Sequence, residues 1–135
     1  MPVIAYHGTS SRHRASLTAG LQPVPNNWGG GELGHGFYCV TAANIETARV
    51  YGGQACNDVN EQIDIWSVSC AENLIQLTGG AVGVTNQWAG ITDFLLTNYD
   101  YLYNQAEAGN ISQVKFNPRF YDRLTLSLVE SNPYN

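Results

Sequence analysis

The chain has 135 residues and a net charge of −5, with 44% hydrophobic and 13% charged residues. This length predicts one domain over residues 1–135. The negative charge argues against broad binding to phosphate backbones, because nucleic-acid-binding modules are usually basic. The sequence has neither an apolar run near the ~20 residues of a membrane span nor a signal-peptide pattern. We therefore expect a cytoplasmic chain with no membrane partner.

The three cysteines, Cys39, Cys56 and Cys70, show no metal-ligand spacing, so we expect no metal. An odd number fits a reducing compartment, while one disulfide with a free thiol stays open.

The first elements predicted along the chain are a strand and a short helix. Val3 to Tyr6 is a short apolar strand. Ser10 or Ser11 caps a helix from about Arg12 to Ala19, which stops at Gly20. Residues 21–35 carry two prolines and four glycines without periodicity, so we expect a loop.

A G-x-G-x-x-G pattern begins at Gly29 inside this loop. In a Rossmann fold such glycines follow a buried strand and open a helix. Here two prolines precede them, and the aromatic and β-branched residues 37–41 that follow read as a strand. The order of elements excludes a Rossmann turn.

Helices and strands then alternate without a regular βαβ order. Thr41 or Asn44 caps a helix that ends near Tyr51, before a pair of glycines. Alternating apolar residues predict a strand within 61–70. A further amphipathic helix is predicted from apolar residues spaced three and four apart: Trp88, Ile91, Leu95, Tyr99 and Leu102.

Two strands are predicted near the C-terminal end. Ile111 to Phe116 is ended by the turn signal Asn117-Pro118, and alternating leucines (Leu124, Leu126, Leu128) mark the last strand. Strands dominate both ends and helices the middle, which predicts an α+β fold.

Two segments carry a resemblance to a known family. YHGTS (6–10) and GHGFYCVT (34–41) resemble the first two signature motifs of the His-Tyr-Glu class of ADP-ribosyltransferases. This class includes diphtheria toxin and the poly(ADP-ribose) polymerases. The resemblance runs from Tyr6 to Tyr51, and only the order of elements matches downstream. It implies an ADP-ribosyltransferase-like split β-sandwich with flanking helices, with NAD bound as substrate in a cleft.

The resemblance also implies roles for particular residues. His7 would bond a ribose hydroxyl, and Gly8 would offer bare backbone to the carboxamide. Tyr38 and Tyr51 would sandwich the nicotinamide ring, although each also fits a packed core. Thr47 would hydrogen-bond the carboxamide.

Two further residues join the expected NAD-binding set. Thr9 follows Gly8 in the first motif, and Arg12 is the candidate for a phosphate contact. A solvated helix face is the alternative for Arg12, His13 and Arg14.

The third motif departs from the family pattern. The family places a Glu on a late strand, and the equivalent strand here, 111–116, offers Gln113 as its best-placed polar residue. We favour Gln113 as a catalytic residue beside His7 and Tyr38, with Glu107 as the acidic alternative. Glu130 comes too late in the chain. A neutral amide carries no charge to stabilise an oxocarbenium, which brings hydrolysis of NAD into consideration.

The resemblance implies an NAD-dependent mono-ADP-ribosyltransferase, and we expect one of toxin or effector type that is delivered into the cytosol of a target cell. The acceptor is unknown (protein, nucleic acid or small molecule), and an immunity or delivery protein is a candidate partner. An NAD glycohydrolase is the main alternative. An RNA 2′-phosphotransferase shares the His-Gly-Thr opening but has a basic second motif. A non-catalytic NAD- or ADP-ribose-binding module is the fourth hypothesis.

Overall fold

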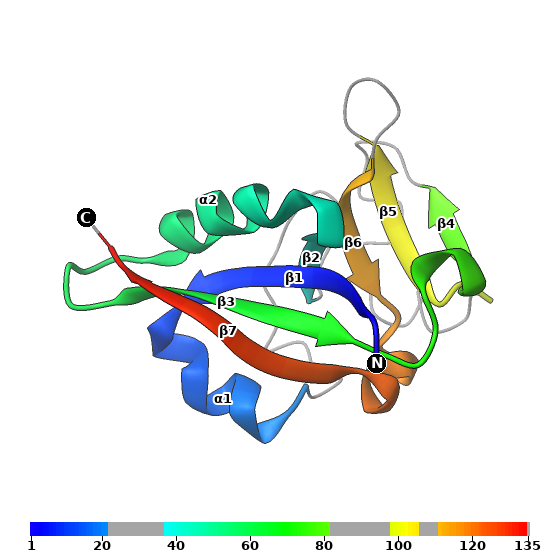
Figure 1. Ribbon diagram of the computed structural model, residues 1–135, viewed down its shortest axis with the longest axis horizontal. Coiled ribbons are helices and arrows are strands. Elements are labelled where there is room, and N and C mark those ends of the chain that lie inside the picture. Colours follow the sequence, from blue (N-terminus) through cyan, green and yellow to red (C-terminus); the bar gives the residue numbers. More distant parts are fainter. Residues whose placement is uncertain (22–36, 82–97, 106–110, 135) are drawn as a thin grey trace.

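A seven-stranded, mostly antiparallel sheet forms the centre of the protein in a computed structural model, which describes residues 1–21, 37–81, 98–105 and 111–134 (Figure 1). The strand order is β4-β5-β6-β2-β1-β3-β7. The strands are β1 (Val3–Ser10), β2 (Tyr38–Thr41), β3 (Gln62–Ser69), β4 (Gly79–Ala81), β5 (Tyr101–Gln105), β6 (Ile111–Phe116) and β7 (Thr125–Pro133). The helices are α1 (Arg14–Ala19) and α2 (Ile45–Ala55), with 3-10 turns η1 (Ser11–His13), η3 (Ala42–Asn44), η4 (Leu74–Gln76) and η6 (Pro118–Arg123).

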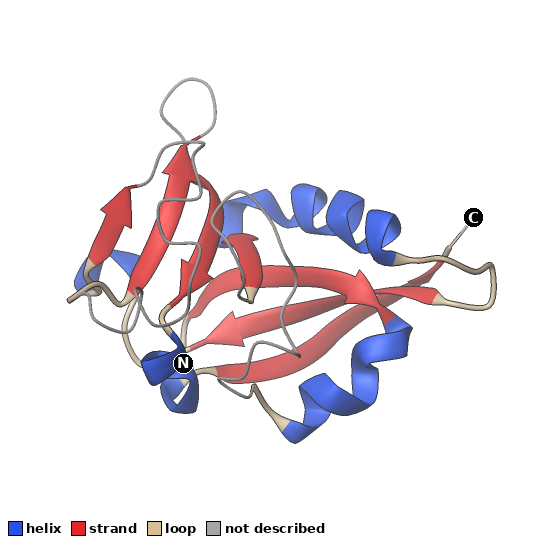
Figure 2. Cartoon of the chain, turned by 180° about the vertical axis from the view of Figure 1, so that it is seen from behind, coloured by secondary structure: helices blue, strands red, loops and turns tan. Residues whose placement is uncertain are grey.

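The sheet divides where β1 and β2 diverge. β1 pairs with β3 along its whole length but with β2 only at Ala5 and Tyr6. β2 instead pairs with β6 through Tyr38 and Cys39. Figure 2 shows β4, β5 and β6 turned steeply against β1, β3 and β7. In the described part of the chain, the edge of β1 from His7 onward therefore has no strand beside it on the β2 side.

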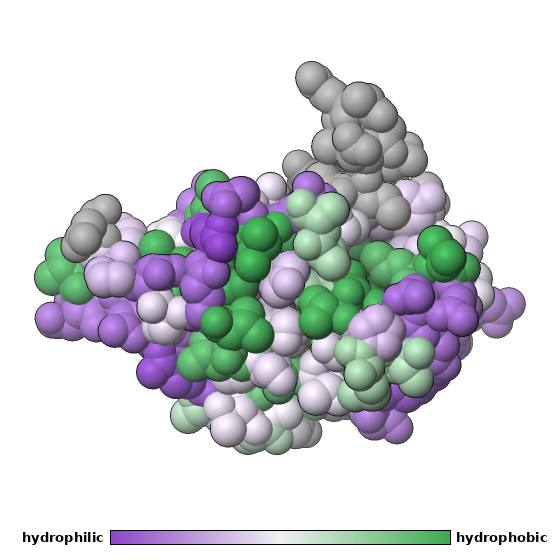
Figure 3. All heavy atoms as spheres, in the orientation of Figure 1, coloured by the Kyte–Doolittle hydropathy of each residue, from purple (hydrophilic) through white to green (hydrophobic). Residues whose placement is uncertain are grey.

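The two helices lie on different sides of the long strands (Figure 1). On the α2 side, Ala48 packs with Val40 and Ile65 in one buried cluster. On the α1 side, Leu17 and Trp66 belong to a larger cluster that η6 completes. Hydrophobic residues on the face in Figure 3 form separate patches broken by polar ones, so that face offers no continuous apolar surface.

The α+β prediction is confirmed, and several predicted elements have the expected bounds. The strand Ile111–Phe116 is found as predicted, and the strand predicted within 61–70 is β3. Ser10 caps the first turn by accepting the Arg12 N–H, and α1 ends before Gly20, whose φ of 104° suits a glycine. The first strand runs on to Ser10, beyond the predicted Tyr6.

Two further predictions are wrong, one of a helix end and one of an element type. α2 continues through Gly52 and Gly53 to Ala55 instead of ending near Tyr51. Gly52 packs closely against the backbone of Thr9, so a glycine here allows close packing of the helix and does not end it. Leu102 lies in β5, between β4 and β6, rather than in a helix. The predicted helix otherwise falls mostly in residues 82–97, which, like the loop 22–36, are outside the described residues.

Candidate functional site

His7 lies where β1 and β2 diverge. Its Nδ1 is 2.5 Å from the carbonyl oxygen of Tyr38, and its ring contacts Phe37 at a centroid distance of 4.2 Å. A carbonyl oxygen only accepts hydrogen bonds, so Nδ1 carries the proton and Nε2 holds the lone pair. Burial lowers the pKa of His7 to about 4, outweighing the bond to the carbonyl, which raises it. At neutral pH, His7 is therefore an uncharged acceptor at Nε2.

Gln113 and Tyr51 meet across the space between β6 and α2. The Gln113 amide Nε2 donates to the Tyr51 hydroxyl at 3.3 Å, and both side chains are partly buried. The two residues are 62 positions apart in the sequence. The fold thus brings the helix of the second motif to the strand proposed to hold the third.

Tyr38 connects these two places. It lies opposite Lys115 in the β2–β6 register, two residues from Gln113 on β6. Diagonal neighbours of this kind are roughly 7–8 Å apart between Cα atoms, and residues two apart share a face. Tyr38, Gln113 and Lys115 therefore lie on one face of the sheet.

Lys115 is a residue of this region that the sequence analysis missed. Its side chain is fully buried, and burial lowers its pKa to about 8. The alternation of ISQVKF places it on the face of Gln113, which is the signal that was available in the sequence. A buried lysine with a lowered pKa beside the motif residues is a candidate member of a functional site.

Gly8 has a packing role. A Cβ at Gly8 would lie 1.8 Å from the carbonyl oxygen of Ala48 and 3.1 Å from the Gly52 nitrogen. The missing side chain lets α2 lie directly on β1. Thr9 is buried beside this contact, and Thr47 is half-buried on α2.

Arg12 is bound to another part of the chain. Its guanidinium donates to both carboxylate oxygens of Glu61 at 2.8 Å and to the carbonyl of Ala55 at 3.1 Å. Its side chain is 41% exposed, so a ligand phosphate has access to it but competes with Glu61.

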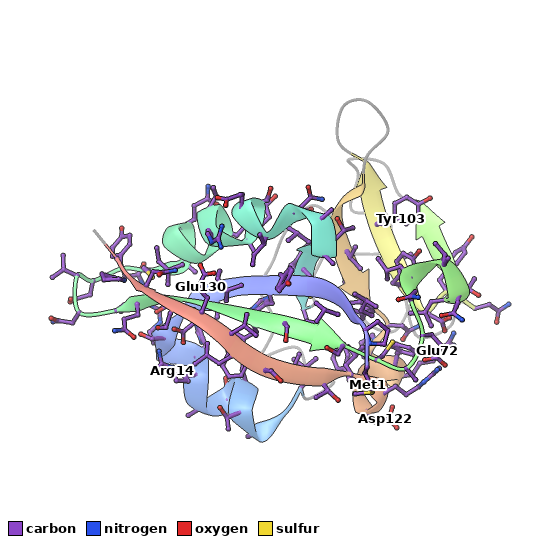
Figure 4. The ribbon with its side chains drawn as sticks, in the orientation of Figure 1. Met1, Arg14, Glu72, Tyr103, Asp122 and Glu130 are labelled. Carbon is purple, nitrogen blue, oxygen red and sulfur yellow. The ribbon has the colours of Figure 1, made fainter. Side chains whose placement is uncertain are left out.

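Most of the other cationic side chains also bind partners within the chain. The sequence has six Lys and Arg residues, and all six are described. Besides Arg12, three form ion pairs with carboxylates: Arg14 with Asp64, Arg49 with Glu130 and Glu46, and Arg123 with Glu72. Figure 4 labels Arg14 and Glu130, which belong to two of these ion pairs, one at α1 and one at α2. The remaining two are Arg119, which donates to the Tyr99 carbonyl, and the buried Lys115.

The acidic candidates for the third motif residue are Glu107 and Glu130, and the structure describes only Glu130. Glu130 lies on β7, four strands from β6 in the sheet order, which is roughly 19 Å along the sheet. Its carboxylate is paired with Arg49. Glu107 falls outside the described residues.

Other kinds of site find no support in the described residues. No group of three or more metal-ligating side chains gathers there, and no helix there has the length and apolar character to cross a membrane. The three cysteines are buried free thiols. Comparison of the chain with protein-family models, curated proteins and solved structures finds no match.

Proposed function

We propose that the protein is an NAD-dependent mono-ADP-ribosyltransferase with an ADP-ribosyltransferase-like split sandwich. The hydrogen bond between Gln113 and Tyr51 supports this most directly. The two residues have different expected roles and belong to segments far apart in the sequence, yet their side chains touch. The divergence of β1 and β2 at His7 adds a length of β1 edge that pairs with no strand on the β2 side among the described residues.

The side chains suit a reaction at the nicotinamide ribose. The bond from C1′ to the nicotinamide nitrogen breaks, and its electron pair leaves with a neutral nicotinamide. An acceptor atom then donates a lone pair to C1′ and releases its proton to solvent. In this proposal the ribose lies where β1 and β2 diverge, and His7 Nε2 accepts from a ribose hydroxyl on the side of Trp66. The rings of Tyr38 and Tyr51 hold the nicotinamide, and the Gln113 amide orients the ribose on the side of α2.

Hydrolysis of NAD is the second candidate, and Gln113 favours it. An amide does not remove a proton from a weakly nucleophilic acceptor, so water at high concentration competes well.

A 2′-phosphotransferase acting on RNA has less support. Four arginines already form ion pairs with carboxylates of the chain, which leaves little positive charge for a polyanionic acceptor.

The test follows the fate of labelled ADP-ribose. Purified protein is incubated with NAD labelled in the adenosine part, first alone and then with a lysate as a source of acceptors. Transfer predicts label on an acceptor, and hydrolysis predicts free ADP-ribose at the same rate with or without lysate. NAD that stays intact under both conditions contradicts both activities.

A further inference from the structure

The side chain of Trp66 carries a polar atom whose burial needs an explanation. Trp66 is 3% exposed, and its indole Nε1 has no hydrogen-bond partner within the described part of the chain. Buried indole N–H groups usually find an acceptor, because an unmet donor loses its bond to water without replacement. A ligand that supplies an acceptor removes this cost.

Trp66 is the cross-strand neighbour of His7. The two residues lie directly opposite in the β1–β3 register, so their side chains leave the same face of the sheet, with Cβ atoms roughly 5 Å apart. His7 has its Nδ1–H on the Tyr38 carbonyl, which leaves the lone pair at Nε2. One face of two paired strands thus carries, on cross-strand neighbours, a residue with an acceptor and a residue with a donor.

We propose that Trp66 Nε1–H is a ligand-binding donor that acts with His7 Nε2 to hold the two neighbouring hydroxyls of one ribose. One hydroxyl donates to His7, and the other accepts from Trp66. The proposal rests on the proposed function, since it names the part of NAD that these side chains hold. Because the indole N–H is buried, the ligand reaches it when side chains beside His7, such as Phe37, move aside.

The probe is a carbocyclic analogue of NAD, in which a methylene replaces the ring oxygen of the nicotinamide ribose. This analogue keeps all ribose hydroxyls and is not cleaved, so its dissociation constant is measured without turnover. Trp66→Phe keeps an aromatic ring and removes the N–H. We expect the dissociation constant to rise about 3- to 10-fold, with the thermal midpoint unchanged or higher. In a His7→Ala background the same change has a smaller effect, because the diol is no longer held from both sides.

A second measurement does not use a variant at Trp66. In a ¹H–¹⁵N spectrum of the wild-type protein, the Trp66 indole signal moves downfield on addition of the analogue. Trp28 and Trp88 are the chain's other two tryptophans, and Trp28→Phe and Trp88→Phe identify the remaining indole signal as that of Trp66. Equal affinity in Trp66→Phe, or an indole signal that stays in place while the analogue binds, overturns the proposal and leaves the proposed function standing. Failure of the wild-type protein to bind either NAD or the analogue overturns both.

Discussion

Replacement of Gly8 by alanine tests the contact between α2 and β1. The added Cβ would lie 1.8 Å from the Ala48 carbonyl oxygen, whereas real Cβ atoms essentially never come within 3.0 Å of a neighbour. The atom it meets is backbone, so no side-chain rotation relieves the clash, and α2 must shift by roughly 1 Å or more.

The expected loss is large for a single methyl group. Overpacking costs ~1–3 kcal/mol in ordinary cores, and we expect Gly8→Ala at the upper end because a whole helix must move. For a domain of this size, ~3 kcal/mol lowers the thermal midpoint by about 10 °C. Circular dichroism melting measures the change.

Gly53→Ala is the matched control in the same helix. A Cβ there meets only the Ile63 Cδ1, at 3.7 Å, which is ordinary contact. Alanine is favoured over glycine inside a helix by up to ~1 kcal/mol, so this variant melts at an equal or higher temperature. An unchanged midpoint in Gly8→Ala would refute the close packing of α2 on β1.

Three further predictions concern charge and catalysis. Burial lowers the pKa of His7 from 6.5 to about 4, so on acidification the unfolded chain takes up a proton before the folded one. The free energy of unfolding therefore falls between pH 6.5 and 4, by at most ~1.4 kcal/mol per pH unit, and His7→Gln should flatten this slope in denaturant titrations; equal slopes contradict the burial of His7. Arg14→Ala leaves the fully buried Asp64 carboxylate without its bidentate partner and should cost ~3 kcal/mol, whereas Glu46→Ala, at an 83% exposed carboxylate, should cost less than ~1 kcal/mol; similar losses would count against the ion pair of Arg14 with Asp64. Gln113→Ala should lower NAD turnover by ~10²-fold, and Gln113→Glu should keep or raise it, because a carboxylate attracts the developing cation; full activity in Gln113→Ala removes Gln113 from the site.

Much of the fold was predictable because its signals are local. Alternating residues mark β3 and β6, and the glycine after α1 has the positive φ that its position suggested. The errors arise where distant residues decide. The glycine pair in α2 looks like a helix stop. In the fold, Thr9 and Ile63 lie against Gly52 and leave no room for a side chain at this position. Leu102 fits a helical spacing, but its neighbours on β4 and β6 make it part of a strand.

The candidate site shows the same division. Motif resemblance points to His7 and Tyr38, and the position of a predicted strand points to Gln113, but neither gives the geometry that joins them. The tautomer of His7 depends on the Tyr38 carbonyl, and the unpartnered donor of Trp66 depends on the burial that folding imposes. Similarly, the ion pair of Arg12 with Glu61 joins residues 49 positions apart, which no local pattern predicts.

In the proposed function, this site binds and cleaves NAD. The most direct measurement is the release of nicotinamide from NAD, followed by proton NMR, with wild-type protein, Gln113→Ala and the control Gln54→Ala, which changes an exposed glutamine on α2. We expect release by the wild-type and Gln54→Ala proteins and a loss of ~10²-fold in Gln113→Ala. Wild-type protein that leaves NAD intact, or equal release by all three proteins, contradicts it.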